Sequence, residues 1–159
     1  MNRETALLLR IIDQAFDRPS WHGPNLRNSI RGLSARDAAW RPGKGRHSVQ
    51  EIAVHAAYWK YVVRRRLLGE KRGSFPLAGS NWFPRVAPDT REWKEDVRLL
   101  EEQHTLLRRA VATVPAADLE KPLAGGTVTP LVLISGIAAH DLYHAGQIQL
   151  LKRMLRARS

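Results

Sequence analysis

The chain has 159 residues, of which 43% are hydrophobic, and this is typical of one globular domain over residues 1–159 and not of a disordered chain. Cysteine is absent, which excludes disulfides, cysteine-ligated zinc and a protein thiol nucleophile and agrees with a cytoplasmic location. The formal net charge of +11 is spread along the chain as arginines interleaved with acidic and apolar residues, which favours solvated helix faces over a nucleic-acid-binding surface.

The first predicted helix covers residues 3–16. Its apolar stripe is made of Leu8, Ile11, Ile12 and Ala15. Charged side chains interrupt this run, so we expect an amphipathic helix and not a signal peptide. No segment of the sequence reaches the roughly 20 uncharged apolar residues that a membrane-spanning helix needs, so no membrane is expected as a partner.

The second predicted helix begins after Ser48, which forms a capping-box pattern with Glu51, and it stops near Gly69. Its apolar face reads Ile52, His55, Ala56, Trp59, Val62 and Val63. A histidine therefore lies within a stripe that we expect to be buried.

The third predicted helix is capped by Asp89 and runs to about Val114. Its apolar seam repeats at steps of four and three residues and contains His104.

The fourth predicted helix opens with Thr129 as its cap and Pro130 in its first turn. Its apolar stripe is Leu133, Ile137, His140, His144, Ile148, Leu151 and Leu155.

The connection between the second and third helices is a Gly/Pro-rich stretch over residues 69–89. Extended chain covers about 3.3 Å per residue, while a helix of roughly 20 residues is only about 30 Å long, so this connection can span the bundle. We therefore predict an all-α four-helix bundle with an up-down-down-up path. A connection of this length is also a candidate lid or binding loop.

Three histidines on the apolar faces of two helices, His55, His140 and His144, are candidate metal ligands. Residues at i and i+4 lie on the same side of a helix, so His140 and His144 can reach one point. A third imidazole from a facing helix would complete a three-nitrogen face with an open position, as in catalytic divalent-metal sites. The simpler alternative is that each is a core histidine bonded to a carbonyl.

His104 has three open interpretations: a fourth ligand, a group that contacts a ligand, or a core residue, of which the core residue is favoured. Metal-bound histidines usually donate their second N–H to a carboxylate, amide or carbonyl. Three nearby side chains are candidates for this role: Glu51, Asp141 and Gln147. Glu51 could instead serve the capping box, and Asp141 could face solvent.

The remaining histidines, His22 and His47, lie in loop-like sequence and are expected to be exposed. The five tryptophans are most simply explained as core or loop anchors.

The segment "HDLYHAGQIQLLKR" resembles the closing motif of the DinB/YfiT-like family, in which His-x-x-Tyr-His-x-Gly-Gln recurs. "HSVQEIAVHAAYW" is similar to the first ligand segment of that family, and the resemblance covers nearly the whole chain in helix order. It implies an up-down-down-up bundle, often dimeric, with nickel or zinc held by His55, His140 and His144. His47 is a departure, since relatives often carry Trp before the position of Ser48, and His104 has no role in the family pattern.

The resemblance implies a metal-dependent enzyme of the thiol S-transferase type that uses a low-molecular-weight thiol, or a related hydrolase or isomerase. A bound metal would lower the pKa of the thiol. Two alternatives stay open. A non-catalytic metal- or ligand-binding or regulatory module agrees with the lack of an identifiable general base, and a nucleic-acid-associated basic bundle is suggested by the charge alone. The expected partners are a small thiol or electrophile and a second copy of the chain.

Overall fold

The computed structural model describes residues 2–158, and over this range the chain is all-α, with no strand. Four long helices carry most of the chain, and two short helices and one 3-10 turn lie between them. Their bounds are α1 Arg3–Phe16, α2 Leu26–Ile30, α3 Ala35–Ala39, α4 Val49–Leu67, α5 Thr90–Ala112, η1 Ala116–Asp118 and α6 Pro130–Arg156.

Each long helix begins after a side chain that accepts a hydrogen bond from the backbone of the first turn. These caps are Asn2, Ser48, Asp89 and Thr129. The predicted starts of the last three helices are thereby confirmed, and Ser48 and Glu51 form the complete capping box. Local side-chain chemistry fixes these boundaries because the first backbone N–H groups of a helix have no partner within it.

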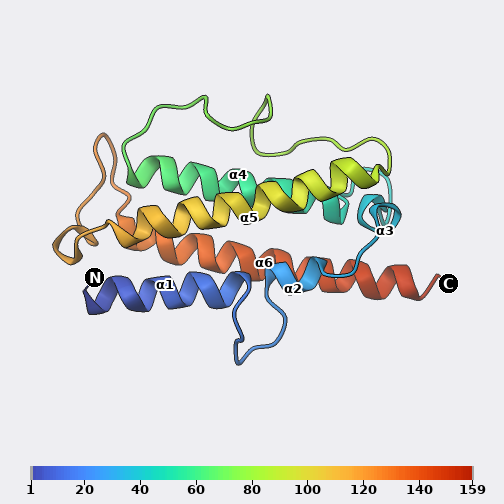
Figure 1. Ribbon diagram of the computed structural model, residues 1–159, viewed down its shortest axis with the longest axis horizontal. Coiled ribbons are helices and arrows are strands. Elements are labelled where there is room, and N and C mark those ends of the chain that lie inside the picture. Colours follow the sequence, from blue (N-terminus) through green and yellow to red (C-terminus); the bar gives the residue numbers. More distant parts are fainter. Residues whose placement is uncertain (1, 159) are drawn as a thin grey trace.

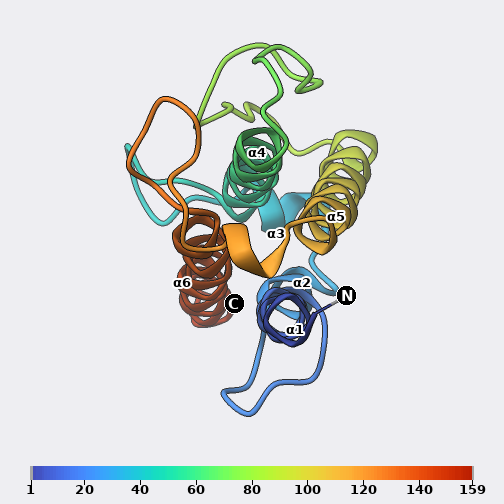
Figure 2. The same cartoon turned by 90° about the vertical axis from the view of Figure 1, so that its left-hand side faces the viewer.

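The four long helices lie side by side (Figure 1). In this view α1 and α6 run from left to right, whereas α4 and α5 run from right to left. The connection between α4 and α5 passes along the outside of α4 from one end to the other. Viewed along the helices, α4 lies between α5 and α6, and α1 closes the fourth side (Figure 2).

Helix α4 is buried over all of residues 49–58, which is more than its predicted apolar face. The long connection covers the side that the sequence pattern left open, where Phe83 packs with Val54, Tyr58 and Tyr61. Its opposite side contacts α3, α5 and α6. The helix that carries His55 is therefore enclosed by protein along most of its length.

No helix within residues 2–158 has the length and apolar character needed to cross a membrane.

Candidate metal centre

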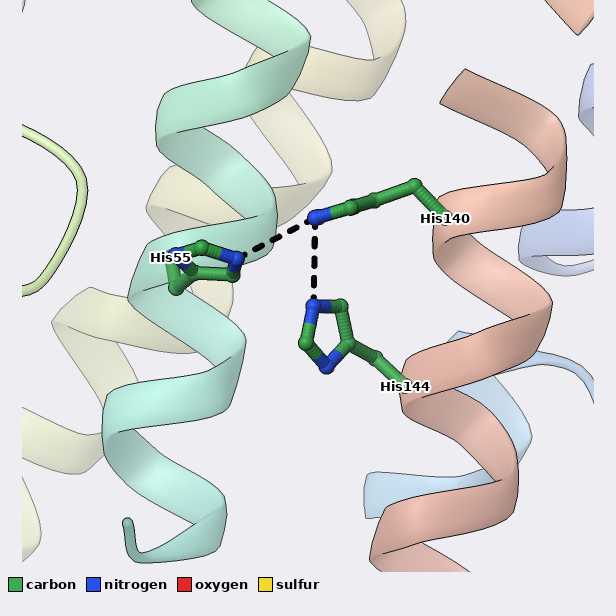
Figure 3. A group of neighbouring side chains, drawn as sticks. All are labelled: His55, His140 and His144. Atoms are coloured by element: carbon green, nitrogen blue, oxygen red, sulfur yellow. Dashed lines mark hydrogen bonds between the residues drawn. The ribbon is translucent and has the colours of Figure 1, made fainter. Parts of the chain in front are cut away.

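Helices α4 and α6 bring three imidazole rings together inside the bundle (Figure 3). Nε2 of His140 lies 3.1 Å from Nε2 of His55 and 3.1 Å from Nε2 of His144. His55 and His144 are buried, and His140 is partly buried. Their ligand atoms all lie within 4.8 Å of one another, so the three side chains could hold one metal ion.

The outer nitrogens of two rings face oxygens that can only accept a hydrogen bond. Nδ1–H of His55 donates to the carbonyl oxygen of Asn81 over 2.8 Å, and Nδ1–H of His144 donates to Oε1 of Gln147 over 2.7 Å. A neutral imidazole carries one proton, so both rings turn a lone pair on Nε2 toward the centre. The Gln147 amide is itself fixed, because its Nε2 donates to the hydroxyl of Tyr143 over 2.9 Å.

The third ring, His140, faces the two lone pairs with its own Nε2. Its Nδ1 is buried and has no hydrogen-bond partner among the described residues. A single proton on His140 cannot form good hydrogen bonds with both neighbours, whereas one cation between the rings would use all three lone pairs. Three neutral imidazoles are a donor set that suits zinc, nickel, copper and iron, so these residues fit a divalent transition metal.

Burial keeps the rings in the neutral form that binds metals. Burial, together with smaller contributions from the neighbouring rings of His144 and His55, lowers the pKa of His140 to about 3. Burial also lowers the pKa of His144 to about 4, although its bond to Gln147 acts the opposite way. The pKa of His55 is lowered mainly by burial as well. At neutral pH all three rings are therefore neutral and not imidazolium ions.

A cavity of about 600 Å³ opens beside the three histidines. Its lining is Pro42, Gly45, Arg46, His47, Ile52, His55, Trp82, His140, Tyr143, His144, Gln147, Leu150, Leu151 and Met154. The volume falls in the range of ordinary small-molecule sites. A ligand in this cavity can therefore reach the point where the three nitrogens meet.

Trp82 forms one wall of this cavity as the middle ring of a stack. Its centroid lies 3.8 Å from that of His55 and 3.6 Å from that of His47, and the rings are tilted by only 10° and 2°. Asn81, the preceding residue, has φ of 65° and also accepts a hydrogen bond on Oδ1 from Nε1 of Trp59. The long connection thus holds the His55 ring in two ways: Asn81 accepts a hydrogen bond at its edge, and Trp82 stacks on its face.

Gln147 is the candidate supporting residue that bonds to a ligand ring. Glu51 completes the capping box and forms a two-pronged ion pair with Arg41. Asp141 is buried and pairs with Lys60. Neither carboxylate therefore bonds to a ligand ring: that of Glu51 caps α4 and pairs with Arg41, and that of Asp141 pairs with Lys60 in the bundle core.

His104 lies in the core, away from the group of three histidines. Its ring stacks on Phe16 at 3.9 Å between centroids, and its Nε2 lies 3.5 Å from Oδ1 of Asp13. This placement agrees with the favoured core interpretation. His22 is exposed, as expected. His47 is also on the surface, but it lines the cavity through its stack on Trp82.

Sequence reasoning missed Asn81 and Trp82 as parts of the site. Both lie in a connection without periodicity, so no spacing rule places them near His55. Only the length of this connection indicated that it takes part in the site, because connections this long are often binding loops.

A family model described as the DinB superfamily matches residues 20–148, which include all three histidines. Comparison with the curated proteins and with the solved structures finds no match.

Proposed function

We propose that this chain, which belongs to the DinB superfamily, binds one divalent metal ion through His55, His140 and His144 and acts as a metal-dependent thiol S-transferase. The observation that carries the proposal is the convergence of three imidazole nitrogens beside an open cavity. A closed structural site would use a fourth protein ligand, whereas a catalytic site leaves a position for an exogenous molecule.

A low-molecular-weight thiol is the proposed co-substrate because the chain contains no cysteine that could act as the nucleophile. When bound, a divalent ion supplies Lewis acidity that lowers the pKa of such a thiol. The protein contributes orientation: the Asn81 carbonyl and the Gln147 amide hold two rings with their lone pairs inward. Trp82 covers one face of His55 and limits the access of water from that side.

Nickel and zinc are the proposed metals, as the family resemblance implies, and a neutral imidazole set is suited to both. We also propose a homodimer in the cytoplasm. Light scattering on the purified chain tests the dimer.

Metal analysis of purified protein tests the metal proposal. The wild type should carry about one ion per chain, and His55→Ala and His144→Ala should each lose it, since two imidazoles hold such an ion weakly. His22→Ala is the matched control, because it removes an exposed histidine outside the site. Equal metal content in all four proteins would overturn the proposal.

Turnover separates the transferase from a non-catalytic binding module. The metal-loaded wild type is incubated with a panel of low-molecular-weight thiols and alkyl-halide or epoxide electrophiles, and loss of free thiol is followed. Transfer that disappears in His144→Ala supports the enzyme. A metal-loaded protein without turnover on the whole panel would favour the binding or regulatory module.

A further inference from the structure

The cavity beside the histidines has two chemically different sides. On one side are apolar side chains of α4 and α6: Ile52, Leu150, Leu151 and Met154. On the other side is the loop before α4, which contributes Arg46 and His47. None of the residues that line the cavity is acidic. A ligand that fits both sides is therefore an anion with an apolar body.

Part of the apolar side is exposed to solvent and is not used in the packed core of the bundle. Leu150 is 60% exposed and Met154 is 41% exposed, and both lie on the last turns of α6 that face the cavity. Leu151, which also lines the cavity, is buried. An apolar ligand lying against these side chains would remove their surface from water, which is favourable in proportion to the area covered.

The loop that carries Arg46 is held in place by a neighbouring arginine. Arg41 donates to the backbone oxygen of Arg46 over 3.0 Å and to Oε1 of the buried Glu51 over 2.8 Å. It also donates to the backbone oxygen of Arg85 over 3.0 Å, which ties the long connection to the same point. The backbone of Arg46 is thus fixed against the start of α4 on the rim of the cavity.

Arg46 lines the cavity, and its guanidinium makes no ion pair or hydrogen bond with the other residues among 2–158. The guanidinium of the other arginine of this loop, Arg41, is already bonded to Glu51 and to the backbone oxygens of Arg46 and Arg85. One available guanidinium matches one carboxylate, because its two parallel N–H groups fit the two carboxylate oxygens. A phosphate group would call for more donors than this rim offers.

We propose that the cavity binds a small monocarboxylate with an apolar tail, the carboxylate on Arg46 and the tail along Leu150 and Met154. The binding of the carboxylate does not depend on the proposed function, because it uses residues outside the metal centre. Only the statement that this ligand is the substrate rests on the proposed function. The electrophile that receives the thiol is then an apolar carboxylic acid that also carries an epoxide or an alkyl halide, and not a sugar or a nucleotide. The thiol sulfur bonds to the electrophilic carbon as its C–O or C–halogen bond breaks, and the thiol proton goes to the opened oxygen or leaves with the halide.

Binding of three matched probes tests the charge preference: octanoate, octanol and octylamine, measured by calorimetry on metal-loaded and on chelator-treated protein. Octanoate should bind about tenfold more tightly than octanol, a difference of about 1.4 kcal/mol for one charge-assisted contact at a half-open rim, and octylamine should bind least. Arg46→Gln should abolish the preference. Arg36→Gln, an exposed arginine on α3 outside the cavity, should retain it.

The apolar side is tested by tail length. From hexanoate to octanoate, each added methylene should tighten binding by up to about fourfold, as expected for a buried CH₂. Leu150→Ser should flatten this series, whereas Val132→Ser should leave it unchanged. Val132 is a close control because it lies on the same helix, is 58% exposed and does not line this cavity.

Two outcomes would overturn the proposal. One is equal binding of octanoate and octanol by the wild type. The other is a preference that survives Arg46→Gln and disappears when the metal is removed, since the carboxylate would then sit on the metal. Failure of the metal proposal looks different: the wild type would carry no ion, and octanoate binding would still depend on Arg46.

Discussion

Lys60 on α4 donates a hydrogen bond to Asp141 on α6, and each side chain is only 1% exposed. The pair links the two helices that carry the candidate ligands, and Asp141 directly follows His140. Burial raises the pKa of Asp141 to about 6, while the Lys60 ammonium and its hydrogen bond act in the opposite direction. The carboxylate is therefore charged at neutral pH because its partner is present.

Removing Lys60 alone should destabilise the bundle strongly. We expect Lys60→Met to lower the free energy of unfolding at pH 7 by about 3 kcal/mol or more, since an unpaired carboxylate stays buried. The double variant Lys60→Met/Asp141→Leu should recover most of this loss, because no charge remains. Urea denaturation of the wild type and the variants, including Asp141→Leu, gives the coupling energy. A double variant as unstable as Lys60→Met would contradict this account.

Acid should destabilise the protein through His104. Burial, with smaller contributions from Lys60 and Arg108, lowers the pKa of His104 to about 2. In the unfolded chain the ring titrates near 6.5, so below about pH 6.5 the unfolded state binds a proton that the folded state does not. The stability that the neutral ring contributes is complete above this pH and is lost as the pH falls toward 2.

The variant His104→Leu isolates this effect because it cannot titrate. Between pH 7 and pH 5 the wild type should lose about 2 kcal/mol more unfolding free energy than the variant. Asp13, 3.5 Å from the ring, is present in both proteins, so its own titration largely cancels. Parallel pH profiles would show that the ring does not stay neutral in the fold.

The side-chain amide of Gln147 should increase the metal affinity of the site by orienting His144, without itself coordinating the ion. Its Oε1 fixes the tautomer and the rotation of the His144 ring. We expect Gln147→Ala to weaken binding of Zn²⁺ or Ni²⁺ by about 10- to 100-fold in a competition with a chromophoric chelator. Gln149→Ala is the control, since that amide donates to Ser29 and is not bonded to a ligand ring. The same loss in both variants would indicate a general effect on α6.

The backbone at Asn81 should tolerate glycine and reject valine. With φ of 65° this position suits Gly, so Asn81→Gly should keep the carbonyl that accepts from His55. Asn81→Val should cost about 1–3 kcal/mol of stability, because a β-branched side chain is strained there. It should also weaken metal binding more than Asn81→Gly does. Thermal unfolding and chelator competition measure the two effects, and equal behaviour of the variants would refute the role of the backbone.

The four long helices and the candidate ligands could be predicted from local patterns in the sequence. Caps such as Ser48 and Thr129 act within one turn, and the apolar period is set by neighbours three and four residues away, so both can be read locally. The pair His140 and His144 follows the same rule. His55 joined this pair as a candidate because it lies on the apolar face of the second helix, and the family resemblance supported all three as one ligand set. The structure brings the three rings together.

The surroundings of these rings could not be predicted in this way, because they depend on how distant parts of the chain pack together. His55 and His140 are 85 positions apart, and Asn81 reaches His55 from a connection without periodicity, so their contacts depend on how α4, α6 and that connection pack. The same packing turned Asp141 toward Lys60 and left Gln147 as the partner of His144. A side chain next to a ligand in sequence can point to either side of a helix, and the neighbour that satisfies it is chosen by the fold.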